Sequence, residues 1–255
     1  PASCSTVQTG MQGFCTTRVS VLNTPFATTG ASASGIVASL ESKKLDDEVT
    51  VLAFAGDGGT TDIGIQALSG AAERGTNFIY LCYDNEAYMN TGVQRSGSTP
   101  LGASTTTTPG GKLRKKKDMP RILEAHGIPY VATASAGYPM DLYEKLQKAK
   151  TIKGTKYIHV HSPCPPGWGF EPRYMIKVSK LAVQTGYWPL YEVIDGKMEL
   201  SRNSRKYLDE DKRKPVEEYL NAQKRFQHVS EEQVGQYRQY VKSLWRHISQ
   251  RLQQE

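Results

Sequence analysis

Two short apolar runs, separated by a glycine turn and a helical segment, constrain the fold of this chain more than any other feature. Residues 49–55 (VTVLAFA) form a β-rich apolar run that ends at Gly56, and residues 78–83 (FIYLCY) form a second one. Continuous apolar runs of this length are typical of buried strands. Residues 61–74 carry apolar side chains at helical spacing and end at Gly75. A strand, a helix and a strand within 35 residues predict a βαβ unit, and therefore a parallel sheet with a right-handed crossover.

The same alternation continues along the chain. Further strands are predicted at 130–134 and 157–160, and helices at 31–41, 118–126, 139–148 and 173–184. We therefore expect residues 1–195 to form an α/β domain with a doubly wound, mostly parallel sheet. A ligand of such a domain lies at the carboxyl ends of the strands, where Asp57 and the Asp84-Asn85 pair occur.

After Gly196 the composition becomes polar and charged, and we expect residues 196–255 to form a C-terminal helical extension. The sequence SEEQ at 230–233 is a capping box, which marks the start of a helix. Apolar residues then recur at helical spacing from Val234 to Leu252. We interpret this stripe as a packing face against this subunit or a partner. No stretch of the sequence approaches the roughly 18–20 apolar residues of a membrane helix, so no membrane contact is expected.

The net charge of +7 is compatible with nucleic acid, an anionic cofactor or an acidic protein as partner. A nucleic-acid-binding protein would pair this charge with aromatic or groove-entering motifs. The sequence contains none of these motifs, so we expect no nucleic-acid partner.

Four cysteines without a disulfide framework indicate a reduced, cytoplasmic protein. Cys82 lies inside an apolar run and is interpreted as a small buried hydrophobic residue. Cys4 and Cys164 lie among Pro, Ser and Gly, where a thiolate can reach a metal. Two thiolates do not complete a four-ligand site, so each is also compatible with an ordinary free thiol.

The turn GDGG at 56–59 combines the chemistry of a phosphate site with that of a metal site. Glycines at a strand-to-helix turn let backbone N–H groups approach a phosphate. A carboxylate among these amides, here Asp57, can anchor the divalent cation that neutralises a diphosphate, and Mg²⁺ favours such oxygen ligands.

Asn85 follows Asp57 after 28 residues, about the length of one helix and one strand. This spacing returns the chain to the neighbouring strand end, where the side-chain oxygen of Asn85 and a nearby backbone carbonyl complete an oxygen-rich Mg²⁺ site. The pattern GDG…N at this spacing is the thiamine-diphosphate motif. The alternative is a simple glycine turn with an unrelated loop asparagine.

Over residues 33–195 the chain closely resembles the beta subunit of the pyruvate:ferredoxin (2-oxoacid:ferredoxin) oxidoreductase family. The segments that carry this resemblance are GDGGTTDIG (56–64), YDNEAYMNTG (83–92), QRS (94–96), TTTTP (105–109), HGIPYVATA (126–134) and SPCPPGW (162–168). The resemblance implies a thiamine-diphosphate-binding fold and three cofactors, which are thiamine diphosphate, Mg²⁺ and a [4Fe–4S] cluster.

The resemblance also assigns residues to these cofactors. It makes the Mg²⁺ ligands Asp57, Asn85 and the carbonyl of Ala87. The positions around the diphosphate are Gly56, Gly58, Gly59 and Asn90. In the family Cys164 matches the last ligand of the [4Fe–4S] cluster and Cys4 the third, and the first two form an upstream Cys-x-x-Cys pair. The start at Pro1 reads like the middle of a domain, so we expect further residues upstream.

By resemblance the reaction is the coenzyme A-dependent oxidative decarboxylation of a 2-oxoacid, with electrons passed through the cluster to ferredoxin. The expected partners are the alpha subunit, gamma and delta subunits, ferredoxin, coenzyme A and the 2-oxoacid. The acid–base glutamate belongs to the partner subunit in this family, so no catalytic residue is expected here. Glu86 is interpreted as a structural helper.

Several alternatives stay open. Residues 5–29 depart from the pyruvate enzymes of the family, so oxalate and phenylglyoxylate are candidates beside pyruvate. A non-oxidative thiamine-diphosphate decarboxylase or synthase would need no cluster, and an assembly subunit would bind no thiamine diphosphate. Residues 90–117 form a long loop without a predicted element, which indicates function. The basic run at 112–117 is either a solvated face or a docking site for coenzyme A or ferredoxin.

Overall fold

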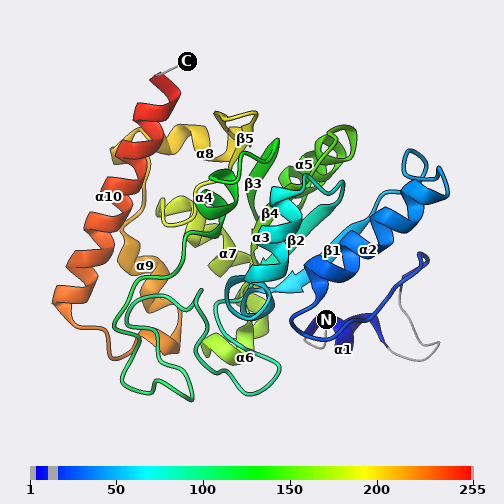
Figure 1. The fold of residues 1–255 in the computed structure, drawn as a ribbon. Coiled ribbons are helices and arrows are strands. Elements are labelled where there is room, and N and C mark those ends of the chain that lie inside the picture. The colour runs from blue at the N-terminus through cyan, green and yellow to red at the C-terminus, as the bar shows by residue number, and fades with distance from the viewer. Residues whose placement is uncertain (1–3, 11–16, 254–255) are drawn as a thin grey trace.

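The computed structural model describes residues 4–10 and 17–253, and a six-stranded sheet forms the centre of this part of the chain (Figure 1). The strands are β1 (Leu52–Gly56), β2 (Ile79–Asp84), β3 (Tyr130–Ser135), β4 (Lys156–His161), β5 (Tyr191–Ile194) and β6 (Lys197–Leu200). Their order across the sheet is β1-β2-β4-β3-β5-β6. The first four pair in parallel, and β5 and β6 are antiparallel to their neighbours. The expected mostly parallel α/β fold is confirmed.

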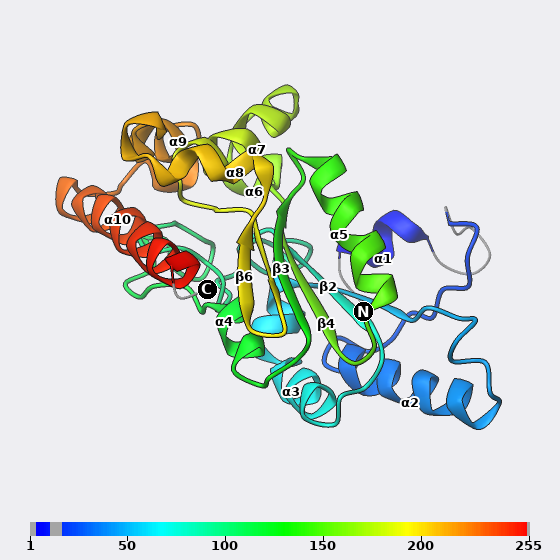
Figure 2. The same ribbon diagram turned by 90° about the horizontal axis from the view of Figure 1, so that it is seen from above.

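Helices cover both faces of this sheet, as a doubly wound fold requires. They are α1 (Cys4–Thr9), α2 (Thr29–Ser42), α3 (Ile65–Glu73), α4 (Met119–Glu124), α5 (Pro139–Thr151), α6 (Pro165–Trp168), α7 (Met175–Gln184), α8 (Arg202–Arg205), α9 (Val216–Asn221) and α10 (Glu231–Gln253). Figure 2 shows α5 on one face of the sheet and α3 and α4 on the other, with α10 beside α4.

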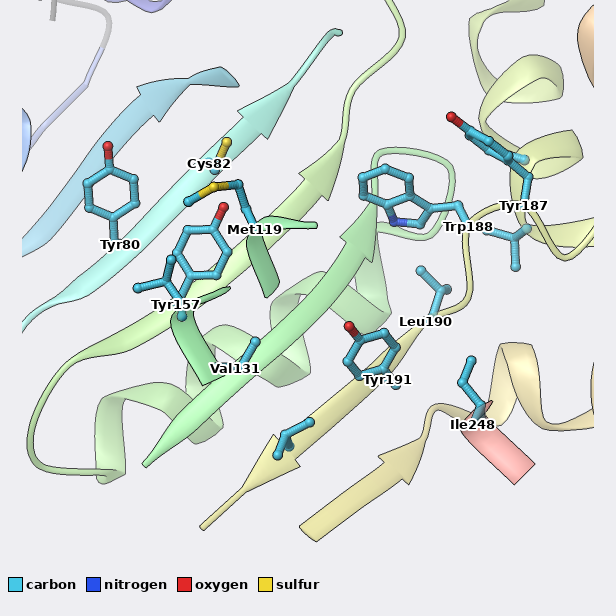
Figure 3. Packing of buried hydrophobic residues seen from close by; sticks show 14 of the residues in the cluster. Tyr80, Cys82, Met119, Val131, Tyr157, Tyr187, Trp188, Leu190, Tyr191 and Ile248 are labelled. Atoms are coloured by element: carbon cyan, nitrogen blue, oxygen red, sulfur yellow. The ribbon is translucent and has the colours of Figure 1, made fainter. Parts of the chain in front are cut away.

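Alternate side chains of each strand enter two different cores, because successive residues of a strand point to opposite faces. Ile79 and Leu81 of β2 belong to the core beneath α5, whereas Tyr80 and Cys82 belong to the larger core on the other face. Figure 3 shows Tyr80, Cys82 and Tyr157 together on β2 and β4. Cys82 is fully buried, which confirms its interpretation as a small hydrophobic residue.

The first βαβ unit has a turn that differs from the predicted one. β1 ends at Gly56, and the chain then makes a π-helical turn over Gly58–Asp62 before α3 begins at Ile65. The helix predicted at 61–74 therefore begins with a wider turn. Single π-helical turns occur frequently at functional sites.

An antiparallel hairpin of β5 and β6 at the sheet edge was not among the predicted elements. Its turn residues Asp195 and Gly196 have φ angles of 46° and 83°. Positive φ at both positions is what a type I′ turn requires. The expected boundary between residues 195 and 196 lies within this turn. The first strand of the expected extension, β6, therefore belongs to the sheet, and the helices that follow begin after Leu200.

The long C-terminal helix α10 begins as the capping box predicts. The Ser230 amide donates to Oε1 of Gln233, and the Gln233 amide donates to Oγ of Ser230. The buried positions of the helix are Tyr237, Val241, Trp245 and Ile248, so the apolar stripe is a packing face. Within the described ranges, no helix combines the length and the apolar composition that would let it cross a membrane.

The segment 90–117 contains no helix or strand, as expected. A buried lysine organises its middle part. The Nζ of Lys112 donates hydrogen bonds to the carbonyl oxygens of Ser96 (3.3 Å), Gly97 (3.2 Å) and Thr99 (2.6 Å), and this side chain is almost completely buried. Because these carbonyls are satisfied internally, the loop keeps a defined path over the carboxyl ends of the strands.

Candidate cofactor and metal site

The carboxyl ends of β1 and β2 lie side by side, because the strand register pairs Gly56 with Tyr83. Asp57 follows β1 directly and is 1% exposed, and Asn85 follows β2 directly and is 8% exposed. A small cavity lies between these two strand ends. All positions assigned to the cofactor line it together with Cys4; they are Gly56, Asp57, Gly58, Gly59, Asn85, Ala87 and Asn90.

The glycine turn is required by the packing of a tyrosine. A Cβ atom on Gly58 would lie 2.4 Å from Cε1 of Tyr88, which is closer than side-chain atoms approach. The Tyr88 hydroxyl donates to Oδ2 of Asp62 at 3.0 Å, so the ring is held in this place. Only glycine at position 58 therefore leaves the backbone of the turn free to follow its path beside the cavity.

Three oxygen atoms converge in this cavity. One end of the side-chain amide of Asn85 lies 2.9 Å from both the carbonyl oxygen of Ala87 and Oδ1 of Asp57, and in the orientation that places the amide oxygen at this end three oxygens meet. With the amide reversed, its nitrogen would donate to both oxygens. Mg²⁺ binds oxygen ligands at about 2.0–2.1 Å in an octahedron, in which neighbouring ligands are about 2.9 Å apart. The spacing of these three oxygens therefore fits neighbouring positions around one magnesium ion.

Asp57 is the anionic member of this group, and its charge is poorly compensated. Its Oδ2 accepts a hydrogen bond from Oγ of Ser96 at 2.5 Å. The cations of the region pair instead with Asp84 and Glu86. Burial raises the pKa of Asp57 well above its usual range, and the charge of Asp84 adds to this rise. A divalent cation beside the carboxylate would supply the missing compensation.

A network of buried charges lies directly behind the Asn85–Ala87 loop. The Nζ of Lys116 is 2.8 Å from Oδ2 of Asp84 and 2.9 Å from Oε1 of Glu86, while Nη2 of Arg225 is 2.5 Å from Oε2 of Glu86. Nε2 of His159 is 2.8 Å from Asp84. Burial alone would raise the pKa of both carboxyl groups, but Lys116 and these neighbours hold the pKa of each below its usual range. Both carboxylates are therefore ionised, and each is paired with basic side chains.

Trp168 connects this network to the loop that carries Cys164. Its indole Nε1 donates to the carbonyl of Asn85 at 2.7 Å, and its backbone N–H donates to the carbonyl of Cys164 at 2.9 Å. The guanidinium carbon of Arg225 lies 3.7 Å from the centre of the Trp168 ring, a cation–π contact. Arg225, Glu86 and Trp168 thus form a clamp that joins the two loops, and we call it the Arg225 clamp.

The two cysteines assigned to a cluster are both partly buried, and Cys4 lines the cavity. Burial raises the pKa of each thiol, and the charge of Cys164 raises that of Cys4 further, so the two sulfurs are within electrostatic reach of one another. Cys15 lies outside the described residues. A [4Fe–4S] cluster takes four thiolates. The described residues contain no group of three or more metal-binding side chains, so they offer the cluster two ligands.

Known proteins with the same pattern decide the family. Residues 4–160 match the family model for the thiamine pyrophosphate enzyme, C-terminal TPP binding domain. Over 232 residues the chain is 56% identical to the pyruvate synthase subunit PorB of Methanothermobacter thermautotrophicus, and the match covers 89% of this chain and 78% of that protein. The chain is a beta subunit of the 2-oxoacid:ferredoxin oxidoreductase family. The predicted family and enzyme class are thereby confirmed.

Other 2-oxoacid oxidoreductases show the same likeness to this beta subunit. It is 46% identical over 257 residues to the ketoisovalerate oxidoreductase subunit VorB of Pyrococcus horikoshii, covering 97% of this chain and 81% of that protein. Among solved structures it is similar to the 2-oxoglutarate:ferredoxin oxidoreductase from Magnetococcus marinus, with 27% identity and a TM-score of 0.51. That match covers 57% of this chain and 47% of the other. The beta subunit is therefore part of a thiamine-diphosphate-dependent 2-oxoacid:ferredoxin oxidoreductase.

Two lysines of the basic run at 112–117 do not form a solvated face. Lys112 binds carbonyls of the loop and Lys116 joins the buried network, whereas Lys117 pairs with Asp62 and stays exposed. The interpretation as a solvated face is therefore wrong for Lys112 and Lys116. Arg225, Trp168 and Ser96 were also not predicted as site residues. Their roles depend on contacts between distant segments, which no local sequence pattern reports.

His161 gives this beta subunit a pH-dependent stability. Its Nε2 is 3.0 Å from the hydroxyl of Tyr219, and among the described residues its Nδ1 has no hydrogen-bond partner. Burial lowers the pKa of His161 from its usual 6.5 to about 4. The unfolded chain therefore binds more protons between these two pH values, and stability falls as pH falls through this window. We expect a loss of about 3 kcal/mol between pH 7 and pH 4.

Urea denaturation followed by tryptophan fluorescence at a series of pH values measures this loss. A His161→Gln variant should lack this part of the pH dependence. His228→Gln, at an exposed position, serves as the matched control and should retain it. If the free energy of unfolding depends on pH equally in the His161→Gln variant and in the unaltered protein, another group is responsible for the pH dependence.

Proposed function

We propose that this beta subunit holds thiamine diphosphate through a Mg²⁺ ion bound by Asp57, Asn85 and the carbonyl oxygen of Ala87. The observation that carries the proposal is the convergence of the Asn85 side-chain amide on Oδ1 of Asp57 and the carbonyl oxygen of Ala87, with one end of the amide 2.9 Å from each of them. The turn at Gly56, Gly58 and Gly59, together with Asn90, would border the diphosphate, because all four residues line the same cavity.

We further propose that Cys4 and Cys164 bind a [4Fe–4S] cluster at the edge of this cavity, with two more thiolates from outside the described residues. The electrostatic influence of Cys164 on Cys4 supports this assignment, and so does the position of Cys4 in the lining of the cofactor cavity. A cluster in this place would receive electrons from the thiamine site over a short path and pass them to ferredoxin.

The reaction that we propose is the oxidative decarboxylation of pyruvate to acetyl-coenzyme A, carried out with an alpha subunit and with gamma and delta subunits. Thiamine diphosphate supplies the carbon nucleophile and the electron sink for this chemistry. In this chain Asp57, Asn85 and Ala87 would fix the diphosphate end of the cofactor, and the Arg225 clamp would keep their loop rigid. Lys116 and Arg225 engage the carboxylate of Glu86, which therefore holds the loop and transfers no proton.

A branched-chain 2-oxoacid is the second candidate substrate. The relative named ketoisovalerate oxidoreductase subunit VorB covers 97% of this chain, whereas the pyruvate synthase subunit PorB is more identical over 89% of it. The higher identity favours pyruvate. Initial rates of ferredoxin reduction with pyruvate and with ketoisovalerate, each with and without coenzyme A, distinguish the two.

The first test is anaerobic purification of the native complex, followed by analysis of thiamine diphosphate, magnesium, iron and sulfide. We expect all four, and a Cys164→Ser variant should lose about four irons per beta subunit while retaining thiamine diphosphate. Cys82→Ala removes a thiol that lies fully in the core and should retain both cofactors. Thiamine diphosphate without iron in the unaltered complex would favour a non-oxidative enzyme, and iron that survives Cys164→Ser would reject the cluster ligand.

A further inference from the structure

The Met89 side chain lies between the cavity that we assign to thiamine diphosphate and the loop that carries Cys164. Met89 lines this cavity together with Cys4, whereas Cys164 is not among the described residues that line it. Met89 and Cys164 are both half-buried, and both pack against the large hydrophobic core. The methionine therefore connects the wall of the cavity with the surroundings of Cys164.

Gly167 lets the thioether of Met89 come close to Cys164. A Cβ atom on Gly167 would lie 2.2 Å from Sδ and 2.9 Å from Cε of Met89, and 3.4 Å from Sγ of Cys164. These three atoms therefore surround one point beside the backbone of α6, the short helix that follows Cys164. Any side chain at position 167 would displace the thioether from this place, because 2.2 Å is well inside van der Waals contact.

The same methionine adjoins the other cysteine that we assign to the cluster. Cys4 lines the cavity with Met89, and Cys164 lies within electrostatic reach of Cys4. A [4Fe–4S] cluster bound by both cysteines would therefore pack against the Met89 side chain. A thioether is apolar and polarisable, and it has no hydrogen to donate to a cluster sulfur.

We propose that Met89 sets the reduction potential of the [4Fe–4S] cluster from the side of the thiamine cavity. This inference rests on the proposed cluster at Cys4 and Cys164. Reduction by one electron makes the cluster more negative, and polar groups or water beside it stabilise that charge and raise the potential. Met89 occupies a place beside Cys164 that such a group would otherwise take, so it holds the potential low. A low potential lets the reduced cluster pass its electron to an acceptor of the ferredoxin class.

Redox titration of the intact complex, followed by electron paramagnetic resonance, tests this role. The signal of this cluster is the one that disappears in the Cys164→Ser variant. Met89→Gln places a polar amide on a side chain of similar length. We expect it to raise the ratio of reduced to oxidised cluster about 10-fold at a fixed potential, which is a positive shift of about 59 mV for one electron.

Three further variants separate polarity from packing. Met89→Leu keeps an apolar side chain of similar volume and should leave the potential unchanged. Gly167→Ala displaces the unaltered thioether and should shift the potential in the same direction as Met89→Gln. Met140→Gln makes the same chemical change at an exposed methionine of α5, and as the matched control it should have no effect.

The outcomes distinguish this role from a purely structural one. An unchanged potential in both Met89→Gln and Gly167→Ala would overturn the proposal. Equal shifts in Met89→Leu and Met89→Gln would also overturn it, because the polarity of the side chain would then not matter. If Met89→Gln assembles less cluster, the filled sites and the Gly167→Ala variant still report the potential. Absence of iron from the unaltered complex would reject the cluster itself, whereas a full cluster with an unmoved potential would reject only the role of Met89.

Discussion

An Asp57→Asn variant is expected to lose thiamine diphosphate and all 2-oxoacid oxidation, yet to fold at least as stably as the unaltered apoprotein. The Asp57 carboxylate is 1% exposed, and its Oδ1 lies 2.9 Å from the side-chain amide of Asn85. Without a cation the buried carboxylate lacks a counter-charge, and the charge of Asp84 makes its burial more costly. An asparagine removes this buried charge, which should stabilise the apoprotein by about 1–3 kcal/mol. The same change removes the anionic ligand, and Mg²⁺-dependent cofactor affinity should fall more than about 100-fold.

Two measurements on the same samples distinguish this expectation from misfolding. Thermal unfolding of the apoprotein gives the stability, and titration with thiamine diphosphate at saturating Mg²⁺ gives the affinity. Ser96→Ala removes the hydrogen bond to Asp57 together with the one that Ser96 Oγ accepts from the Ser98 amide, and it should weaken binding about 10- to 100-fold, as loss of a partner of a metal ligand does. Asp47→Asn, at an exposed carboxylate paired with Lys153, is the matched control and should change neither quantity. If the Asp57→Asn variant still binds the cofactor, Asp57 is not a ligand of the metal ion.

The position of the site at two strand ends was predictable, because it depends on local pattern and spacing alone. Gly56 and Asp57 end one apolar run and Asn85 follows the next, so a parallel sheet brings them to one edge. The angle at which Asn85 approaches Asp57 was not predictable. It depends on Glu86, whose φ of 65° turns the loop, and on Trp168, which holds the Asn85 carbonyl from the far side.

The buried network escaped prediction for a physical reason. Lys116 stands in a run of basic residues, and in sequence such a run cannot be told from a solvated surface. Arg225 lies 139 residues from its partner Glu86, in a segment predicted only as helical extension. A buried ion pair between distant segments leaves no periodicity, so only the folded chain shows it. The fold class can be predicted without knowledge of these ion pairs, because apolar runs and their spacing determine it.

The hairpin at β5 and β6 was missed although its signal is present. Asp195-Gly196 stands between two short runs with alternating apolar residues, the pattern of a type I′ turn. The change to a polar, charged composition at the same point suggested a domain boundary instead. A polar composition indicates that a segment is exposed, but it does not show where the backbone reverses direction. The turn residues do show this, and here they predict the observed hairpin.

Breaking the Arg225 clamp is the second change for which we expect a large effect. Glu86 is fully buried and bound by Lys116 and Arg225, and Arg225 is 6% exposed. Glu86→Gln leaves the guanidinium buried without its counter-charge, and Arg225→Met leaves the carboxylate with a single cation. Each change should destabilise the subunit by about 3–5 kcal/mol. The double variant removes both charges, so its cost should fall below the sum of the two by about 2–3 kcal/mol.

A double-mutant cycle measured by urea denaturation gives this coupling. The matched control is the pair Glu217 and Arg238, also a glutamate with an arginine at 2.5 Å, in which the arginine side chain is 53% and the glutamate side chain 30% exposed; a much weaker coupling is expected for it, because solvent screens the two charges. Glu86 lies between the two magnesium-ligand positions Asn85 and Ala87, so each single variant should also weaken Mg²⁺-dependent thiamine diphosphate binding. Additive energies would show that the two charges are stabilised independently. If the two charges are strongly coupled but the affinity for thiamine diphosphate is unchanged, the clamp contributes to the stability of the subunit and not to cofactor binding.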